Sequence, residues 1–223
     1  MAVIQLGDHT LQLLAEKAVW CAETGTLFIA DVHLGKTATF RREGIPLPEG
    51  GTDHDLRRLT DLIERHRPRQ LIVLGDLIHA RQGVDGHVTE SFGAWRAQWA
   101  SLNVLLIRGN HDRRLHNWPA RWQLRIEAEP FAWHGLDLRH FPVKEAAAER
   151  PWLAGHLHPS VRVRLGGRES ISAPAYYFLG NGLILPAFGS FTGMARARAS
   201  EAERFFAVVG ESVLEIPARL CRT

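Results

Sequence analysis

Four short apolar runs along the chain end abruptly in polar residues. Residues 26–30, 71–75, 105–109 and 152–155 each have the composition of a buried strand. They lead into Asp31-Val32-His33, Asp76, Asn110-His111-Asp112 and His156-Leu157-His158. In an α/β protein the carboxyl ends of the strands form the edge of the sheet where ligands bind. We therefore expect these four strand ends to meet around one site.

The first half of the chain alternates predicted strands and helices. Residues 3–6, 11–14, 18–21 and 26–30 form two predicted hairpins, and residues 34–42 a short helix over the site. Apolar residues at helical spacing predict helices over 55–67 and 90–100. Asp53-His54-Asp55 lies where the first of these helices should begin, so we expect it to stabilise that helix end. The alternation implies parallel βαβ units.

The second half has a different pattern, with short predicted strands separated by glycine turns. They cover residues 131–133, 136–139, 152–154, 161–165, 176–179, 183–185, 205–209 and 213–216. This pattern predicts a mostly antiparallel second sheet packed on the first. Residues 143–150 read as a surface turn or short helix. No repeat or long linker interrupts the sequence, so we expect an α/β fold in a single domain over residues 1–223.

Composition and charge set limits on the partners. Apolar content of 45% and charged content of 23% are ordinary for a soluble protein. The net charge of +3 is mild, but 24 of the 27 basic residues are arginine, which suits phosphate contacts. No signal peptide or bilayer-spanning segment is evident, so we expect no membrane partner. Cys21 and Cys221 form no spacing motif, which favours a reducing, cytoplasmic setting.

The polar strand ends have the composition of a metal site. The candidate ligands are Asp31, His33, Asp76, Asn110, His140, His156 and His158. Carboxylate, amide and imidazole donors suit Mn²⁺, Fe²⁺ or Zn²⁺. In extended backbone the i, i+2 spacing within Asp31-Val32-His33 and His156-Leu157-His158 would put both polar side chains on one face. Asp76, alone on its strand end, could bridge two ions through its two oxygens. Two divalent ions, offset by two aspartates and a bridging hydroxide, would keep a charge of about +1 to hold a phosphodiester.

Other residues near these segments are candidates for supporting roles. His134 precedes a glycine and is an alternative to His140, which we favour because it ends an apolar-patterned run. His79 follows Gly75-Asp76 closely enough to reach the site, but we favour the role of a loop histidine. His111 could donate a proton to a leaving oxygen, and Asp112 could orient it through the other ring nitrogen.

The complete set of motifs resembles the calcineurin-like metallophosphoesterases. Asp31-x-His33, Gly75-Asp76, Gly109-Asn110-His111-Asp112, a lone histidine and Gly155-His156-x-His158 occur in the order of that family. The resemblance implies a four-layer fold in which two packed mixed sheets are flanked by helices. It also implies that Asp31, His33, Asp76 and His158 hold one metal ion. Asp76, Asn110, His140 and His156 would hold the other.

Two further segments, residues 33–46 and 185–193, resemble the PdeM-type branch of ligase-associated DNA damage response endonucleases. This resemblance implies a Mn²⁺-dependent DNA endonuclease in repair, with a ligase and other repair proteins as functional associates. In that hypothesis a metal-bridging hydroxide attacks phosphorus in line, and His111 assists the leaving group. Basic residues near the motifs could hold flanking phosphates: Arg41, Arg42, Arg81, Arg113 and Arg114.

Two other functions remain open from the residues alone. The same metals would serve a phosphodiesterase or phosphatase for a small nucleotide or another small phosphoester, and the motifs do not separate the two. A non-enzymatic interaction scaffold is the third hypothesis. It ranks last because such a protein would be free to lose its ligands, and this chain keeps all of them.

Overall fold

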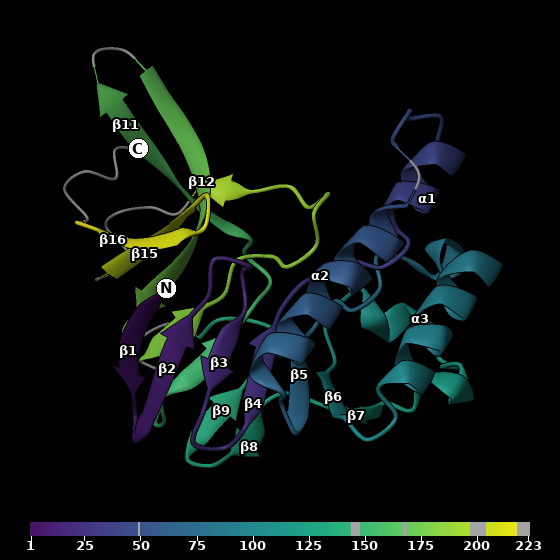
Figure 1. Cartoon of the computed structure of the whole chain (residues 1–223), viewed down its shortest axis with the longest axis horizontal. Coiled ribbons are helices and arrows are strands. Elements are labelled where there is room, and N and C mark those ends of the chain that lie inside the picture. Colours follow the sequence, from purple (N-terminus) through teal and green to yellow (C-terminus); the bar gives the residue numbers. More distant parts are fainter. Residues whose placement is uncertain (49, 144–147, 167–168, 197–203, 218–223) are drawn as a thin grey trace.

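Two β-sheets, one of them flanked by helices, make up the computed structural model of the protein (Figure 1). The structure describes residues 1–48, 50–143, 148–166, 169–196 and 204–217. Part of the turn or short helix expected at residues 143–150 therefore lies outside the described residues. No helix among the described residues is long and apolar enough to cross a membrane.

The first sheet has seven strands in sequence order. Pairing is antiparallel from β1 to β4 and parallel from β4 to β7, as the predicted hairpins and βαβ units require. The strands are β1 (Ala2–Leu6), β2 (His9–Leu13), β3 (Val19–Cys21), β4 (Thr26–Ile29), β5 (Gln70–Leu74), β6 (Asn103–Ile107) and β7 (Arg125–Glu127).

The second sheet is mixed, with the strand order β14-β11-β12-β13-β10-β9-β8 and with β15 and β16 attached through β12. Most of its pairs are antiparallel, as expected, but β10 is parallel to both β9 and β13, and β14 is parallel to β11. The strands are β8 (Phe131–Trp133), β9 (Leu136–Leu138), β10 (Trp152–Ala154), β11 (Pro159–Gly166), β12 (Glu169–Leu179), β13 (Gly182–Ile184), β14 (Ala195–Arg196), β15 (Arg204–Val209) and β16 (Ser212–Ile216).

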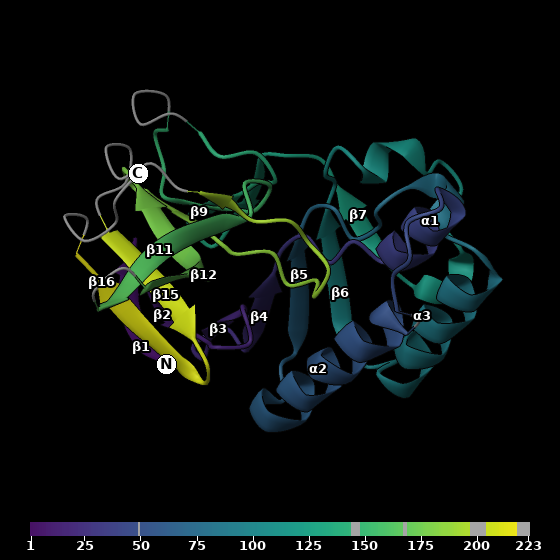
Figure 2. The ribbon, with the colours of Figure 1, turned by 90° about the horizontal axis from the view of Figure 1, so that it is seen from above.

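The described helices belong to the first sheet. They are α1 (Lys36–Arg42), α2 (Gly51–His66) and α3 (Gly86–Gln98), with short 3₁₀ turns η1 (Arg81–Gly83), η2 (Asp112–Arg114) and η3 (Ala120–Trp122). Both long helices begin about four residues earlier than the apolar spacing indicated, because glycine and polar residues fill their first turns. In Figure 2, α2 and α3 lie beside β5 and β6, away from β11, β12 and β16.

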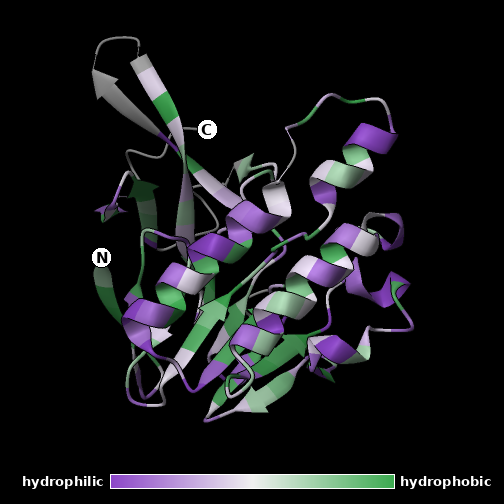
Figure 3. Ribbon diagram, turned by 45° about the vertical axis from the view of Figure 1, so that its right-hand side comes forward, coloured by the Kyte–Doolittle hydropathy of each residue, from purple (hydrophilic) through white to green (hydrophobic). Residues whose placement is uncertain are grey.

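Three apolar clusters hold these layers together. Side chains of both sheets, from Ile4 to Val213, form the cluster between them. The other face of the first sheet packs against α2 and α3, and Figure 3 shows hydrophobic strands beneath the two helices. The outer face of the second sheet is covered in part by Val143, Ala148 and Leu157. In the described residues, the helical layer expected from the resemblance is thus seen on the first sheet alone.

Candidate metal centre

The polar strand ends meet where the carboxyl edges of the two sheets face each other. Asp31 follows β4, Asp76 follows β5 and Asn110 follows β6, and these three strands are parallel neighbours. His140 and His156 follow β9 and β10, which are parallel neighbours in the second sheet. Because parallel strands end at one edge, each sheet delivers its polar residues to the same place.

The backbone at these residues is left-handed rather than extended. Asp31, His33, Asp76, His156 and His158 all have positive φ, between 46° and 72°. The pleat of a strand therefore does not account for how the side chains of each i, i+2 pair are directed. The left-handed backbone at both members of the pair directs them instead. Val32, between the first pair, is buried as expected. Positive φ costs free energy for residues other than glycine, and such strain gathers at functional sites.

One group of candidate ligands contains Asp31, His33 and His158. Their donor atoms all lie within 4.8 Å of one another. His33 Nε2 is 3.3 Å from His158 Nε2, which in turn is 3.5 Å from Asp31 Oδ1. His33 Nε2 also lies 4.0 Å from Asp76 Oδ2. Asp76 therefore borders this group from the neighbouring strand.

A second group contains Asp76, His140 and His156, again with donor atoms within 4.8 Å of one another. His140 Nε2 lies 2.9 Å from Asn110 Oδ1, 3.1 Å from His156 Nδ1 and 3.4 Å from Asp76 Oδ2. The structure thus brings His140 into the cluster. His134 lies in the turn between β8 and β9, where its carbonyl oxygen accepts a hydrogen bond from His9.

The electrostatics of these side chains fit divalent cations. Burial raises the pKa of the Asp76 carboxyl to about 8, and the charges of Asp112 and Asp31 add to this rise. Burial and the neighbouring His158 lower the pKa of His33. Asp31 Oδ1 is buried with no hydrogen-bond partner among the described residues. Crowded lone pairs and an unpartnered carboxylate oxygen are what a bound cation satisfies.

His111 and His79 lie at the mouth of this cluster. The His111 backbone N–H donates to Asp76 Oδ1 at 2.9 Å, and His111 Nδ1 donates to the His79 carbonyl oxygen. The two rings stack at 5.1 Å between centroids. His79 Nδ1 is 3.4 Å from His33 Nδ1. The alternative that His79 reaches the site is thus the one that this geometry favours, although the sequence analysis ranked a loop role above it.

Asp112 does not take the position expected of it. Its carboxylate accepts backbone hydrogen bonds from Gly109 at 2.9 Å and Ile78 at 3.2 Å, and its side chain is fully buried. The His79 carbonyl oxygen occupies the place at His111 Nδ1 expected for Asp112. Asp112 thus joins the segment after β5 to the segment after β6.

Glu129 is a further residue near the centre that the sequence did not reveal. Its carboxylate accepts hydrogen bonds from the backbone N–H groups of His140 and Phe141 at 2.8 and 2.9 Å.

The five arginines near the motifs are all exposed but differ in their contacts. Arg42 donates to the Gln82 carbonyl oxygen and pairs with Asp85 at 3.3 Å. Arg113 lies 3.6 Å from Glu129. Arg41 and Arg81 lie on α1 and η1, and the charge of Arg114 on η2 lowers the pKa of His111.

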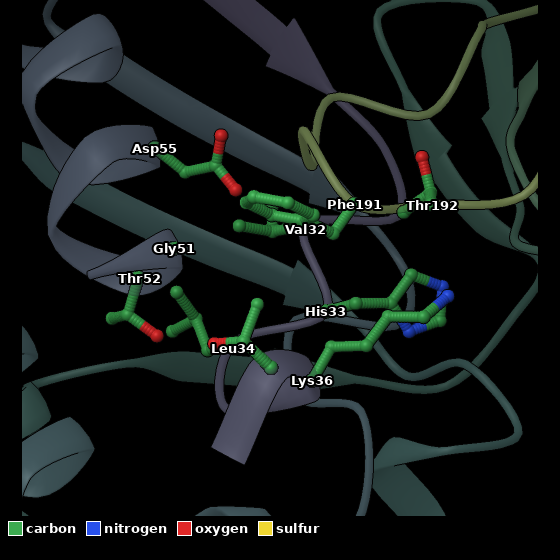
Figure 4. A pocket seen from close by; sticks show the side chains of 10 residues that line it. Val32, His33, Leu34, Lys36, Gly51, Thr52, Asp55, Phe191 and Thr192 are labelled. Carbon is green, nitrogen blue, oxygen red and sulfur yellow. The ribbon is translucent and has the colours of Figure 1, made fainter. Parts of the chain in front are cut away.

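Lys36 is a cation at the site that sequence reasoning missed. Its half-buried side chain runs beside His33 in Figure 4. Its charge lowers the pKa values of His33, His79 and His111. Within the described residues it makes no side-chain hydrogen bond or ion pair, and its ammonium lies 5.6 Å from the Phe40 ring centroid. The sequence signal was its place three residues after a candidate ligand.

The loop at residues 186–193 is fixed beside the site by α2. Asp55 accepts hydrogen bonds from the Ser190 backbone N–H and hydroxyl, and Arg58 donates to the Phe188 carbonyl oxygen at 2.8 Å. Figure 4 shows Phe191 and Thr192 of this loop opposite Asp55. Because α2 begins at Gly51, Asp55 lies inside the helix. The expected helix-end role therefore applies to Asp53, in its first turn, and Asp55 anchors the loop instead.

Comparisons with known proteins agree with this geometry. Residues 25–182 match the family described as calcineurin-like phosphoesterases. The crystal structure of nuclease MPE from Pseudomonas putida is 33% identical in sequence and superposes with a TM-score of 0.78, covering 96% of this chain and 99% of that one. The phosphoesterase YfcE from E. coli is 15% identical, covering 86% of this chain and 98% of that one. The two structures superpose with a TM-score of only 0.40.

Among curated protein sequences we found no match. The family match covers more than half of the chain, and the likeness to nuclease MPE extends over nearly all of it. The two mixed sheets and their helices are the fold expected of this family, whose members use divalent metal ions. The chain therefore belongs to the calcineurin-like phosphoesterases, hydrolases that act on phosphoester bonds.

Proposed function

We propose that this protein is a manganese-dependent endonuclease that cleaves DNA phosphodiester bonds in repair. The observation that carries this proposal is the convergence of two ligand groups on Asp76. The nuclease likeness over nearly the whole chain supports a nucleic acid as the substrate. A functional association with a DNA ligase and other repair proteins belongs to the same proposal and rests on the sequence resemblance.

Two divalent ions would share the cluster. Asp31, His33, His158 and Asp76 would hold one, and Asp76, Asn110, His140 and His156 would hold the other. Oxygen and imidazole donors without a thiolate suit Mn²⁺, with Fe²⁺ and Zn²⁺ as alternatives. When bound, the ions would neutralise the phosphate charge and generate the attacking nucleophile from water.

His111 is the proposed proton donor to the leaving oxygen. Because a carbonyl oxygen only accepts, the contact with His79 fixes the hydrogen of His111 on Nδ1 and turns Nε2 towards the cluster. The side chain is 26% exposed, so a substrate oxygen can reach Nε2. Protonated Nε2 would give its proton to the departing alkoxide. Asp112 and Glu129 act here as positioning residues, through backbone contacts with the segments that carry His111 and His140.

The surroundings of the cluster support a polymeric substrate. His111 and His158 are partly exposed, so the cluster opens to solvent. Lys36 and Arg114 lie near its mouth, where their charges act on His111, and no ion pair of theirs is seen in the described part of the chain. A chain of phosphates extending beyond the metals would meet these cations.

A side-by-side assay tests the proposal. Metal-depleted protein would be given Mn²⁺, Fe²⁺ or Zn²⁺ and offered single-stranded DNA, duplex DNA, cyclic nucleotides and phosphate monoesters. We expect DNA cleavage, strongest with Mn²⁺ and falling steeply with salt. Efficient turnover of a cyclic nucleotide or monoester with no DNA cleavage would instead establish the small-substrate alternative.

A further inference from the structure

A second group of potential metal ligands lies at the other end of the first sheet. His9 begins β2, Cys21 ends β3, and Glu23 lies in the turn before β4. The β2–β3 register pairs Leu13 with Val19 and Gln12 with Trp20, so its continuation places His9 opposite Glu23. Cys21 lies two residues before Glu23, at the end of β3. β4 separates this group from the candidate metal centre. Thr26 begins the strand on the side of Glu23, and Asp31 follows its other end, about 17 Å away.

The three donor atoms of this group lie within 4.8 Å of one another. His9 Nδ1 is 3.6 Å from Glu23 Oε2, which is 4.0 Å from Cys21 Sγ. Donors in a tetrahedral zinc site are separated by roughly 3.3–3.6 Å. The Glu23 side chain is 48% exposed and can close the small difference by rotation.

His9 presents an unpartnered nitrogen to this group. The residue is only 8% exposed, and Nδ1 has no hydrogen-bond partner among the described residues. His9 Nε2 lies 2.7 Å from the His134 carbonyl oxygen, which can only accept, so Nε2 carries the hydrogen. In the neutral ring, Nδ1 then directs a lone pair towards the carboxylate of Glu23. A buried nitrogen lone pair that faces a carboxylate oxygen is stabilised by a cation between the two acceptors.

We propose that His9 Nδ1, Cys21 Sγ and Glu23 Oε2 bind a zinc-class ion. Thiolate with imidazole selects Zn²⁺ or Co²⁺ over Mn²⁺, the opposite preference to the oxygen and nitrogen donors of the candidate centre. The exposed side of Glu23 leaves a fourth position open to water. The ion would tie two hairpins of the first sheet together and, through His134, fix them to the β8–β9 turn.

Cobalt substitution tests this site without reference to activity. Thiolate bound to Co²⁺ gives a charge-transfer absorption in the near ultraviolet, whereas oxygen and nitrogen donors alone do not. Metal-depleted, reduced full-length protein would be titrated with Co²⁺. At saturation with Co²⁺ we expect the absorption of one thiolate-bound ion per chain, which Cys21→Ala should lose and the matched control Cys221→Ser should keep.

Because Cys21 is buried, Glu23→Gln provides a variant whose folding is not in question. It should retain the sulfur band but need about tenfold or more Co²⁺ to develop it. Zinc analysis by mass spectrometry should find one ion fewer per chain in Cys21→Ala than in wild type. Absence of the band in Co²⁺-saturated wild type, a band lost in Cys221→Ser, or unchanged affinity in Glu23→Gln would overturn the site. None of these results bears on DNA cleavage.

Discussion

At the scale of single residues, backbone contacts position His111 and leave its ring nitrogen Nε2 available to a substrate. The backbone N–H donates to Asp76, and the ring is oriented by a backbone carbonyl oxygen rather than by Asp112. Removing the ring should therefore leave Asp76 in place. This separates the proposed proton donor from the metal ligands.

His111→Ala should lower kcat by about 10²–10⁴-fold while leaving the bound metal content unchanged. Turnover of a chromogenic diester and metal analysis of the same sample measure the two effects. His116→Ala, an exposed histidine of the same segment, serves as the control. Asp76→Ala should abolish turnover and lose metal as well. Wild-type turnover in either His111→Ala or Asp76→Ala would contradict the assigned roles.

The effect of the Lys36 side chain on turnover should depend on the size of the substrate. Lys36→Met should raise KM for DNA and reduce the salt slope of binding by about one unit, since one phosphate contact is lost. A small diester that does not reach Lys36 should be turned over almost as before. Arg57→Met, on the exposed side of α2, is the control cation. Equal losses on both substrates would show that Lys36 acts on the centre itself.

The amine of Lys17 should make the free energy of unfolding depend on pH. Burial, together with the neighbouring Arg58, lowers its pKa from 10.5 to about 8. Between these values the folded chain has released the proton and the unfolded chain retains it, so stability should rise with pH from about 8 towards 10.5. Urea unfolding between about pH 7.5 and 9.5 measures this rise, which Lys17→Met should flatten. If the slope persists in that variant, other groups cause it.

At the scale of elements, the glycine that follows β5 allows the two sheets to approach. Gly75 has φ of 83°, and a Cβ there would lie 2.1 Å from His140 Nδ1. His140 follows β9 of the other sheet, so Gly75 sets the distance between strand ends of different sheets.

Gly75→Ala should displace His140 and destabilise the fold by at least about 1–2 kcal/mol, the cost of left-handed backbone alone. Chemical unfolding and bound metal content measure the two consequences. Gly86→Ala is the matched control, because a Cβ there meets nothing within 4 Å. A Gly75→Ala protein with full metal content would show that the approach is not required.

At the scale of the whole molecule, the apolar cluster between the sheets joins both halves of the chain. It includes Leu11 and Phe28 of the first sheet and Leu138, Leu153 and Phe206 of the second. Neither sheet could expose this face to water without losing the burial that stabilises it. We therefore propose that the chain is a single domain.

A single domain should unfold in one cooperative transition. Metal-depleted protein in urea should give coincident transitions by far-ultraviolet circular dichroism and by tryptophan fluorescence, since Trp122 and Trp152 lie in different clusters. Two separated transitions would mean that the sheets fold independently.

Sequence alone determined the three helices, most of the strands and the polar strand ends, because these follow from local periodicity and from polar residues placed after apolar runs. It missed the short strands β7 and β14 and predicted only the last four residues of β12. It also indicated His140 over His134, and the structure places His140 in the cluster. The helix starts were several residues late, since polar first turns carry no apolar signal.

Only the tertiary structure decided which side chains from distant segments touch. It set β10 parallel to its neighbours, gave His111 a carbonyl partner instead of Asp112, and brought His79 and Lys36 to the centre. Such contacts depend on how two sheets pack and on backbone angles such as the positive φ of Asp31. Packing joins residues far apart in the chain, so no local pattern encodes it.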